Sequence, residues 1–347
     1  MLNKKIIKAS LVIAMTASLL MGCSETSEKE KEEVKTSNVE AESVDTKKVF
    51  VTPQWVQSVI DNNQKESEDY VILECSWGET DMSEDYKSGH IKGAYHMNTD
   101  YIESEELWNL RTPEEIEKVL KDYGITKDTT VIVYSNDVLN AADERVAWTL
   151  LWAGVENVKL LDGGIEAYKE AGYELETTIN EPVKTDEDFG VEIPANEDYV
   201  ISIDETIKKL EEDDFSLVSI RSYDEFIGKV SGYSYMPLAG EPKGAIWGKD
   251  TADYLEEDGT VVDYETLTKY VEEAGSSMDN ELAFYCGTGW RAALPLLIAY
   301  ENNNDNVSLY DGGWYQWYQT DGLEVQKDET DSGEWNYLTT GELNEQK

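Results

Sequence analysis

The chain repeats one pattern of residues about 150 positions apart, and this duplication constrains the fold more than any other feature. Three pairs of segments match in the same order, with offsets of 149 to 151 positions. The pairs are VKLLDGGIEAY (158–168) with VSLYDGGWYQW (307–317), GHIKGA (89–94) with GEPKGA (240–245), and VIVYSND (131–137) with LAFYCGT (282–288). A single match could arise by chance, whereas three in register indicate a duplicated unit of domain size rather than a solenoid repeat.

Each copy alternates strand-like and helix-like segments. Short apolar runs are typical of buried strands, and Thr-Pro pairs at 52–53 and 112–113 are typical helix starts. The apolar runs fall at 70–73, 131–134 and 158–161 in the first copy, and at 217–220, 282–285 and 307–310 in the second. This alternation predicts an α/β fold, in which each copy forms a central, mostly parallel sheet flanked by helices. We expect one domain over residues 48–180 and another over 195–345.

The N-terminal residues do not fit this pattern. Residues 1–22 contain three lysines and then a short run of mostly apolar or small residues, which is typical of a secretory signal. The sequence Leu-Met-Gly-Cys that ends at Cys23 resembles the lipobox of bacterial lipoproteins, whose cysteine is acylated. The alternative is an uncleaved membrane anchor, but the apolar run is short for a membrane span. We therefore expect a lipid anchor at Cys23 and an extracytoplasmic location.

Two polar segments border the predicted domains. Residues 23–47 contain no aromatic residue and consist mainly of Glu, Ser, Thr and Lys, so we expect a disordered acidic tether. The chain after Glu324 is also polar and acidic, and we expect a tail that Trp335 and Tyr337 could hold in place.

The charge of the chain excludes several partners. The formal charge is −44, and it becomes −47 if a signal carrying three lysines and no carboxylate is removed. Nucleic acids require a basic footprint, and anionic lipid head groups also attract basic proteins, so neither is an expected partner. Most of these carboxylates simply solvate the surface. An anionic substrate would need a local cationic site.

Cysteine and histidine are too sparse for a disulfide framework or a zinc site. Apart from Cys23, the chain has only Cys75 and Cys286, and its two histidines are His90 and His96. We therefore predict no metal and no cofactor. Cys75 ends a strand-like run and is expected to be buried and inert, although a redox role opposite Cys286 stays open. His90 is expected to satisfy local backbone groups.

A glycine-rich loop follows Cys286. Two glycines within three residues let the backbone fold tightly, so that its N–H groups point toward the centre of the loop. These donors and the start of the following helix favour negative charge, and therefore the nucleophilic thiolate of Cys286. Arg291 adds a cation at the rim. A lone cysteine at a strand end is more often a small core residue, but the glycines and the arginine argue against that reading here. The loop residues are Gly287, Thr288, Gly289, Trp290 and Arg291.

The length of this loop favours sulfur over phosphate. Cysteine phosphatases place an arginine six positions after the cysteine, in a loop that holds a tetrahedral phosphate. Here the sixth residue is Ala292, and Arg291 comes one position earlier. The shorter loop fits a single sulfur atom bound to Cys286, which indicates a persulfide.

Taken together, these segments resemble the tandem-domain rhodanese family of sulfurtransferases, over nearly all of residues 49–317. The resemblance rests on GHIKGA, GEPKGA, both Asp-Gly-Gly endings, SIRSYDEF (219–226) and YCGTGWRA (285–292). It implies that Cys286 forms the persulfide, that residues 287–291 cradle it, and that Arg221 helps to bind an anionic donor. Trp247, Tyr233 and Tyr235 flank these segments, and they either wall a pocket or pack the two domains together.

The sequence also departs from that family. The first copy has Ser135 where the second has Cys286, and its loop lacks the glycines, so we expect a non-catalytic first domain. Ser219 stands where the family often has Asp, and Glu241-Pro242 replaces the usual His-Ile. The loop matches neither the Arg-Lys pair of thiosulfate-preferring members nor the Gly-Ser-Gly-Val-Thr loop of mercaptopyruvate-preferring ones. The donor type therefore stays open.

Three functions from different classes remain. The leading hypothesis is an enzyme that moves sulfane sulfur from a small anionic donor, such as thiosulfate, to a thiol or cyanide-like acceptor by double displacement. The alternative is an extracytoplasmic persulfide carrier or sulfur-binding lipoprotein, which serves a protein acceptor with little small-molecule turnover. A solute-binding lipoprotein is the third, but it gives no reason for the cysteine loop.

Overall fold

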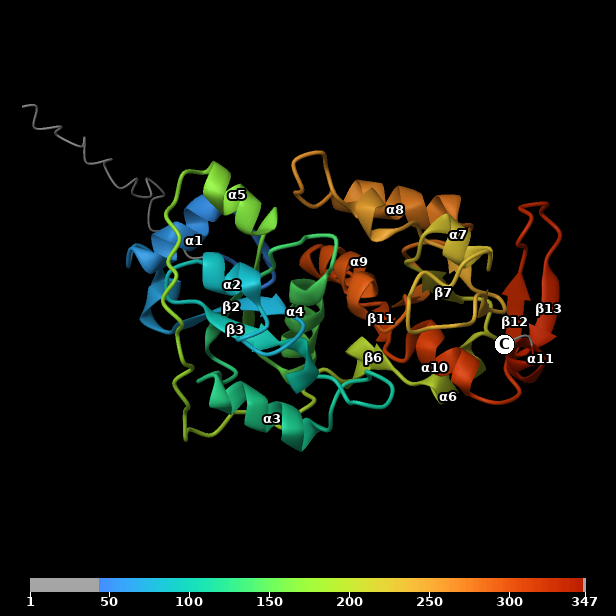
Figure 1. Cartoon of the computed structure of the whole chain (residues 1–347), viewed down its shortest axis with the longest axis horizontal. Coiled ribbons are helices and arrows are strands. Elements are labelled where there is room, and N and C mark those ends of the chain that lie inside the picture. Colours follow the sequence, from blue (N-terminus) through green and yellow to red (C-terminus); the bar gives the residue numbers. More distant parts are fainter. Residues whose placement is uncertain (1–43, 346–347) are drawn as a thin grey trace, which may run out of the picture. The chain divides into compact units, whose positions relative to one another are not determined.

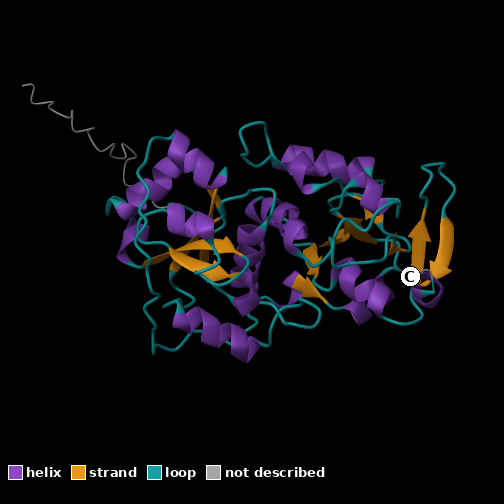
Figure 2. Ribbon diagram, in the orientation of Figure 1, coloured by secondary structure: helices purple, strands orange, loops and turns teal. Residues whose placement is uncertain are grey.

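The first sequence copy folds into a five-stranded parallel sheet with helices around it (Figures 1 and 2). The computed structural model describes residues 44–345. The strand order is β1-β5-β4-β2-β3, and every neighbouring pair is parallel. In chain order the elements are β1 (Phe50–Val51), α1 (Pro53–Ile60), β2 (Tyr70–Ser76), α2 (Glu84–Ser88), β3 (Tyr95–Asn98), α3 (Pro113–Asp122), β4 (Thr130–Tyr134), α4 (Ala142–Ala153), β5 (Asn157–Leu161) and α5 (Gly164–Glu170).

The second copy repeats this topology. Its parallel sheet has the order β6-β11-β10-β7-β9, and each strand holds the place of its counterpart in the first copy. The elements are β6 (Val200–Ile201), α6 (Ile203–Lys209), β7 (Phe215–Ser219), α7 (Tyr223–Phe226), β8 (Glu241–Pro242), β9 (Ile246–Trp247), α8 (Tyr264–Glu273), β10 (Glu281–Tyr285), α9 (Trp290–Glu301), β11 (Val307–Tyr310), α10 (Gly313–Gln319), β12 (Glu324–Lys327), β13 (Asn336–Thr339) and α11 (Thr340–Asn344). The predicted fold class and duplication are confirmed.

Local sequence explains the helix starts. Pro53 is the first residue of α1, and the hydroxyl of Thr52 accepts a hydrogen bond from the backbone of Trp55. Thr112 and Glu115 cap each other at the start of α3. These contacts satisfy backbone N–H groups that have no partner within the helix.

Helices α4 and α9 pack against each other where the two sheets meet (Figure 1). All twelve residues of α4 are buried, including its charged ones, and residues 292–300 of α9 are buried as well. Both helices belong to one hydrophobic cluster that draws on both copies. Residues 146–153 of α4 and 292–300 of α9 are mostly apolar on all sides, as expected for helices without an exposed face, whereas the start of α4 carries Asp143, Glu144 and Arg145.

Two segments differ from expectation. Residues 44–47 fall in the predicted tether, yet Lys47 forms an ion pair with Asp305 at 3.0 Å and the backbone N–H of Val44 donates to Glu66. The segment after Glu324 is not a simple tail, because β12 and β13 form an antiparallel hairpin that β8 extends into a third sheet. Cys23, the rest of the tether and the predicted signal lie outside the described residues. None of the helices within residues 44–345 has the length and apolar character needed to cross a membrane.

Candidate active site

Cys286 lies directly after β10, the central strand of the second sheet. β10 is hydrogen-bonded to β7 on one side and to β11 on the other, so the cysteine leaves the carboxyl end of the sheet. Only three residues separate it from α9, and its side chain is 1% exposed. This is the position at which parallel α/β sheets build their binding sites.

The carbonyl groups of the loop are held by the next helix. The backbone N–H of Trp314 donates to the carbonyl of Cys286 at 2.9 Å, and that of Tyr315 donates to the carbonyl of Gly287 at 3.0 Å. Gly313 permits this approach, because it has a φ of +53° and a Cβ there would lie 2.4 Å from the Gly287 oxygen. The Asp-Gly-Gly ending of β11 therefore fixes the shape of the Cys286 loop.

The N–H groups of the loop are partly free. That of Gly287 donates to the hydroxyl of Tyr233 at 3.1 Å. No acceptor within residues 44–345 takes the N–H of Thr288 or Gly289. Gly289 has a φ of +90° and precedes the first turn of α9, whose own N–H groups lie behind the loop. Free donors at a helix start favour an anion beside them, as predicted for the cradle.

Arg291 is bound by carboxylates rather than left open at the rim. Its guanidinium donates to Glu225 at 2.9 and 3.1 Å, to Asp250 at 3.1 Å, and to the hydroxyl of Tyr233. Burial opposes ionisation of Glu225, but Arg291 and Arg221 outweigh burial and lower its pKa to about 2. The positive charge next to the loop is therefore largely balanced.

Arg221 does not reach the site, contrary to the expectation that it binds a donor. Its side chain is wholly buried and donates to Glu225, to Glu241 and to the carbonyls of Gly240 and Ser231. Arg221 therefore supports the site indirectly, because Glu225 binds both Arg221 and Arg291 and the Arg221 guanidinium lies over the ring of Trp314.

Trp247 also lies away from Cys286, so it does not wall the pocket. Its indole donates to the carbonyl of Arg221, and it lines a different cavity beside Trp335. Tyr233 and Tyr235, by contrast, both lie beside Cys286, and Tyr235 also packs on Trp108 of the first domain with ring centroids 4.8 Å apart.

Cys286 opens into a cavity of about 600 Å³ that both domains line. The second domain contributes residues that the sequence analysis named for the cradle or as a possible wall, which are Tyr233, Tyr235, Thr288, Trp290 and Arg291. The first-domain residues were not predicted, because nothing local marks residues that reach the site from another domain. They are Trp77, Asp100, Glu103, Trp108, Leu139 and Asn140.

A buried ion network joins the first domain to the loop. Arg145 of α4 donates to Glu103 at 3.0 Å and to Asp311, of the second domain, at 2.6 Å. The indole of Trp290 donates to the same Glu103 oxygen at 2.8 Å. Burial raises the pKa of Glu103 to about 7, although Arg145 and Trp290 both favour its charged form. Arg145 also lies against Gly289, where a Cβ would be 3.0 Å from its Nη1.

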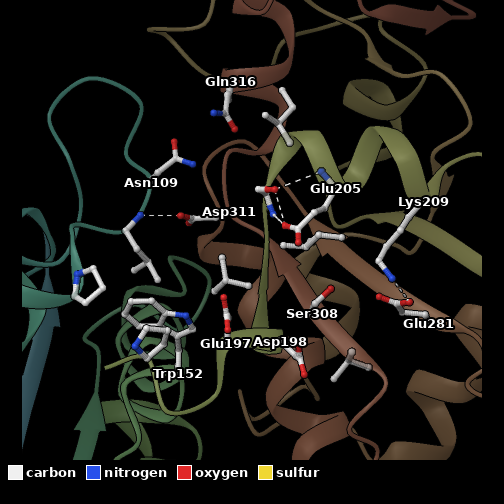
Figure 3. A pocket seen from close by; sticks show the side chains of 18 of the residues that line it. Asn109, Trp152, Glu197, Asp198, Glu205, Lys209, Glu281, Ser308, Asp311 and Gln316 are labelled. Carbon is white, nitrogen blue, oxygen red and sulfur yellow. Dashed lines mark hydrogen bonds and ion pairs between the residues drawn. The ribbon is translucent and has the colours of Figure 1, made fainter. Parts of the chain in front are cut away.

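A larger cavity, of about 1060 Å³, is lined by residues of both domains, among them Asp311 (Figure 3). Asp311 accepts the backbone N–H of Leu110, and Lys209 is paired with Glu281. No cysteine or histidine lines this cavity within the described part of the chain, so it offers neither a thiol nor an imidazole. The smaller cavity at Cys286 is therefore the candidate active site.

The corresponding place in the first domain has a different shape. Ser135 is buried and donates to the carbonyl of Asp137. Six residues, 136–141, separate it from α4, whereas three separate Cys286 from α9. A hydroxyl is a weaker nucleophile than a thiolate, and the longer loop is consistent with a non-catalytic first domain, which stays a prediction.

The remaining cysteine and histidine residues play local roles. Cys75 is fully buried, as expected, and burial together with Asp143 raises its thiol pKa well above the usual value. His90 contacts the carbonyl of Tyr86. His96 contacts Glu74 at 2.6 Å.

Comparison with known proteins agrees with this geometry. The model of the rhodanese-like domain matches residues 52–171 and 202–320, which correspond to the two copies. Thiosulfate sulfurtransferase YnjE of Escherichia coli is 40% identical over 277 residues, which cover 77% of this chain and 62% of YnjE. A putative thiosulfate sulfurtransferase of Haloferax volcanii is 27% identical, with 81% of this chain and 97% of that protein covered.

Solved structures give the same result. The crystal structure of YnjE matches with a TM-score of 0.75 and 38% identity, covering 80% of this chain and 67% of that one. EanB in complex with ergothioneine matches with a TM-score of 0.74 and 32% identity, covering 78% and 68%. The names of the sequence relatives support the predicted sulfurtransferase. Since the family model matches both halves of the chain, this protein belongs to the family of rhodanese-like domain proteins.

Proposed function

We propose that the chain is a sulfurtransferase that carries sulfane sulfur as a persulfide on Cys286. The observation that carries this proposal is the loop: a cysteine at the carboxyl end of the central strand faces a cavity, beside two free backbone N–H groups and the start of α9. The chain spans only 62% of the length of YnjE. We therefore include a sulfurtransferase activity like that of YnjE in the proposal for this chain.

The reaction is a double displacement. The Cys286 thiolate attacks the sulfur that the donor gives up, so a new bond forms at Sγ while the bond between that sulfur and the rest of the donor breaks. In thiosulfate the broken bond is sulfur–sulfur, and its electron pair leaves with sulfite. In 3-mercaptopyruvate the broken bond is carbon–sulfur, and its electron pair leaves with the enolate of pyruvate. An acceptor nucleophile then attacks the terminal sulfur, the bond at Sγ breaks, and its electron pair restores the thiolate.

The loop supplies electrostatic stabilisation at each step. The N–H groups of Thr288 and Gly289 and the first turn of α9 favour the negative charge of thiolate and persulfide. Tyr233 and Arg291 hold the loop from the cavity side, with the Arg291 cation oriented by Glu225. Thiosulfate and 3-mercaptopyruvate are the proposed donors, because relatives bear both names.

Mass spectrometry of the intact protein tests the persulfide. After incubation with thiosulfate and removal of excess donor, we expect one added sulfur atom on Cys286, which cyanide should remove as thiocyanate. Cys75→Ser should still take up the sulfur, because Cys75 is buried away from the cavity lining, and Cys286→Ser should not. Uptake by Cys286→Ser would refute the proposal.

Kinetics distinguish an enzyme from a persulfide carrier. An enzyme should give parallel double-reciprocal plots when thiosulfate and a small acceptor are varied together. A carrier would form the persulfide but discharge it only to a protein acceptor. The wide cavity mouth, where Trp77 is 60% exposed, favours direct access of a small acceptor.

The location is a separate proposal. We propose that the mature chain is anchored by lipid at Cys23 outside the cytoplasmic membrane, because a basic and apolar leader precedes Leu-Met-Gly-Cys. Metabolic labelling with a fatty acid tests it. The wild-type chain should carry label and fractionate with membranes, and Cys23→Ser should lose both properties.

A further inference from the structure

The cavity at Cys286 is much larger than a simple sulfur donor or acceptor requires. Its volume of about 600 Å³ falls in the range of sites that hold organic ligands, roughly 300–1,000 Å³. Thiosulfate and cyanide have only a few atoms each, and they would leave most of this space filled with water. The remaining wall therefore suggests a larger acceptor.

Aromatic side chains from both domains form a large part of the lining of this cavity. Five aromatic side chains line it, and two of them stand at an open mouth, with Trp77 60% and Tyr235 47% exposed. Trp108 packs on Tyr235, and Tyr235 on Tyr233, with ring centroids 4.8 and 5.4 Å apart. The faces of aromatic rings carry partial negative charge and attract cations, above all methylated ammonium groups, which are weakly hydrated.

The charged groups of the wall have the matching sign. Asp100 lines the cavity, and its carboxylate has no ion pair or hydrogen-bond donor within residues 44–345. Glu103 is shared between Arg145 and Trp290. Arg291, which is the cation among the described lining residues, is already bound to two carboxylates. An anionic group would meet no free cation here, whereas a cation would meet a free carboxylate.

We propose that the first-domain wall of this cavity is a subsite for a cationic acceptor: a small thiol whose other end carries a quaternary or methylated ammonium group. The inference rests on the proposed sulfur transfer. The acceptor thiol loses its proton to solvent, and its thiolate attacks the terminal sulfur of the Cys286 persulfide. A sulfur–sulfur bond forms in the acceptor while the bond at Sγ breaks. The electron pair stays on Cys286, and the acceptor leaves as its own persulfide.

The test compares three acceptors that differ in charge. Thiocholine is cationic, 3,3-dimethylbutane-1-thiol is its neutral isostere, and 2-mercaptoethanesulfonate is anionic. The persulfide is first loaded with thiosulfate, and its discharge is followed by mass spectrometry for each thiol, with rates corrected for thiolate concentration. We expect thiocholine to react roughly two- to thirtyfold faster than its isostere at subsaturating concentration, on the scale of cation–aromatic attraction. The anionic thiol should be slowest.

Substitutions in the cavity wall test which residues cause the preference for thiocholine. Asp100→Asn and Trp77→Leu should each lower the ratio of the thiocholine rate to the isostere rate, because each removes a group that attracts a cation. Glu106→Gln removes an exposed carboxylate from the neighbouring loop without touching the cavity lining, and it should leave the preference unchanged. An equal loss in Glu106→Gln would mean that only overall charge matters, and would overturn the subsite.

Binding without chemistry gives an independent measurement. Calorimetry should detect choline binding to the wild-type protein, and weaker or no binding of 3,3-dimethylbutan-1-ol. If the persulfide forms and all three thiols discharge it equally, the cationic subsite is wrong while the sulfur transfer stands. If no persulfide forms on Cys286 at all, the proposed function itself fails.

Discussion

Replacing Arg145 by Met should destabilise the protein more than any surface change, because Arg145 holds two buried carboxylates of different domains. Its contacts to Glu103 and Asp311 are 3.0 and 2.6 Å long, and all three side chains are nearly inaccessible to solvent. Removing one partner of a buried ion pair costs about 3–5 kcal/mol, because the remaining charge is left without compensation. Here two negative charges lose their shared cation, so the upper end of that range is expected at high pH.

The loss of stability caused by Arg145→Met should increase as the pH rises. The pKa of Glu103 is already about 7 in the folded protein, above the ordinary value of 4.5, so the stability linked to its protonation is lost as pH rises through about 7. Without Arg145 this pKa should rise further. The wild-type protein and the variant should therefore be closest in stability near pH 5.5, where Glu103 is protonated in both, and should diverge above pH 7.

Equilibrium urea denaturation at pH 5.5 and pH 8 measures this difference. Lys118→Met serves as the control, because Lys118 forms an exposed i,i+4 pair with Asp122 whose loss should cost only about 0.3–0.5 kcal/mol. Adding Glu103→Gln to Arg145→Met should recover part of the loss at pH 8. A loss in Arg145→Met that is as small as in the control, or that is equal at both pH values, would refute the reasoning.

Three further outcomes follow from the loop. Tyr233→Phe removes the acceptor of the Gly287 N–H, and the rate of persulfide formation with thiosulfate should fall roughly two- to tenfold, on the scale of about 0.5–1.5 kcal/mol for one hydrogen bond. Gly313→Ala should lower both the melting temperature and the activity, because the new Cβ would clash with the loop carbonyls. Gly322→Ala is the control: Gly322 has a φ of +80° and open space around it, so this variant should lose stability through backbone strain only. Ser135→Cys in a Cys286→Ser background should show no persulfide by mass spectrometry, and an added sulfur there would show that the longer loop is also a cradle.

The parallel α/β fold of each copy and the position of Cys286 at the end of a strand follow from the sequence because both depend on local patterns. Buried parallel strands read as apolar runs, and the carboxyl end of such a run marks the site. The buried position of the Arg221 side chain could not be predicted from such local patterns. Its position after β7 suited a donor site, but Glu225, one turn later, and Glu241, from β8, draw the side chain into the interior.

Two other features needed three-dimensional information. The first domain reaches the cavity because α4 packs against α9. The sequence of a buried helix does not indicate which other helix it will pack against. Within the hairpin, β13 is largely exposed, whereas Val325, Gln326 and Lys327 of β12 are buried, and two of these three residues are polar. Trp335 packs on Phe226 with ring centroids 5.5 Å apart. Polar residues at buried positions and an exposed second strand leave little of the apolar alternation on which strand prediction depends.

The shared cavity has a consequence for how such a protein can change over evolutionary time. After duplication, one copy retains Cys286 and its loop, while the other contributes Trp77, Asp100 and Trp108 to the wall. Substitutions in that wall leave the reacting sulfur and its cradle untouched. Under the proposed function, the half of the gene that lacks Cys286 can therefore change the acceptor preference while the cysteine loop in the other half stays the same.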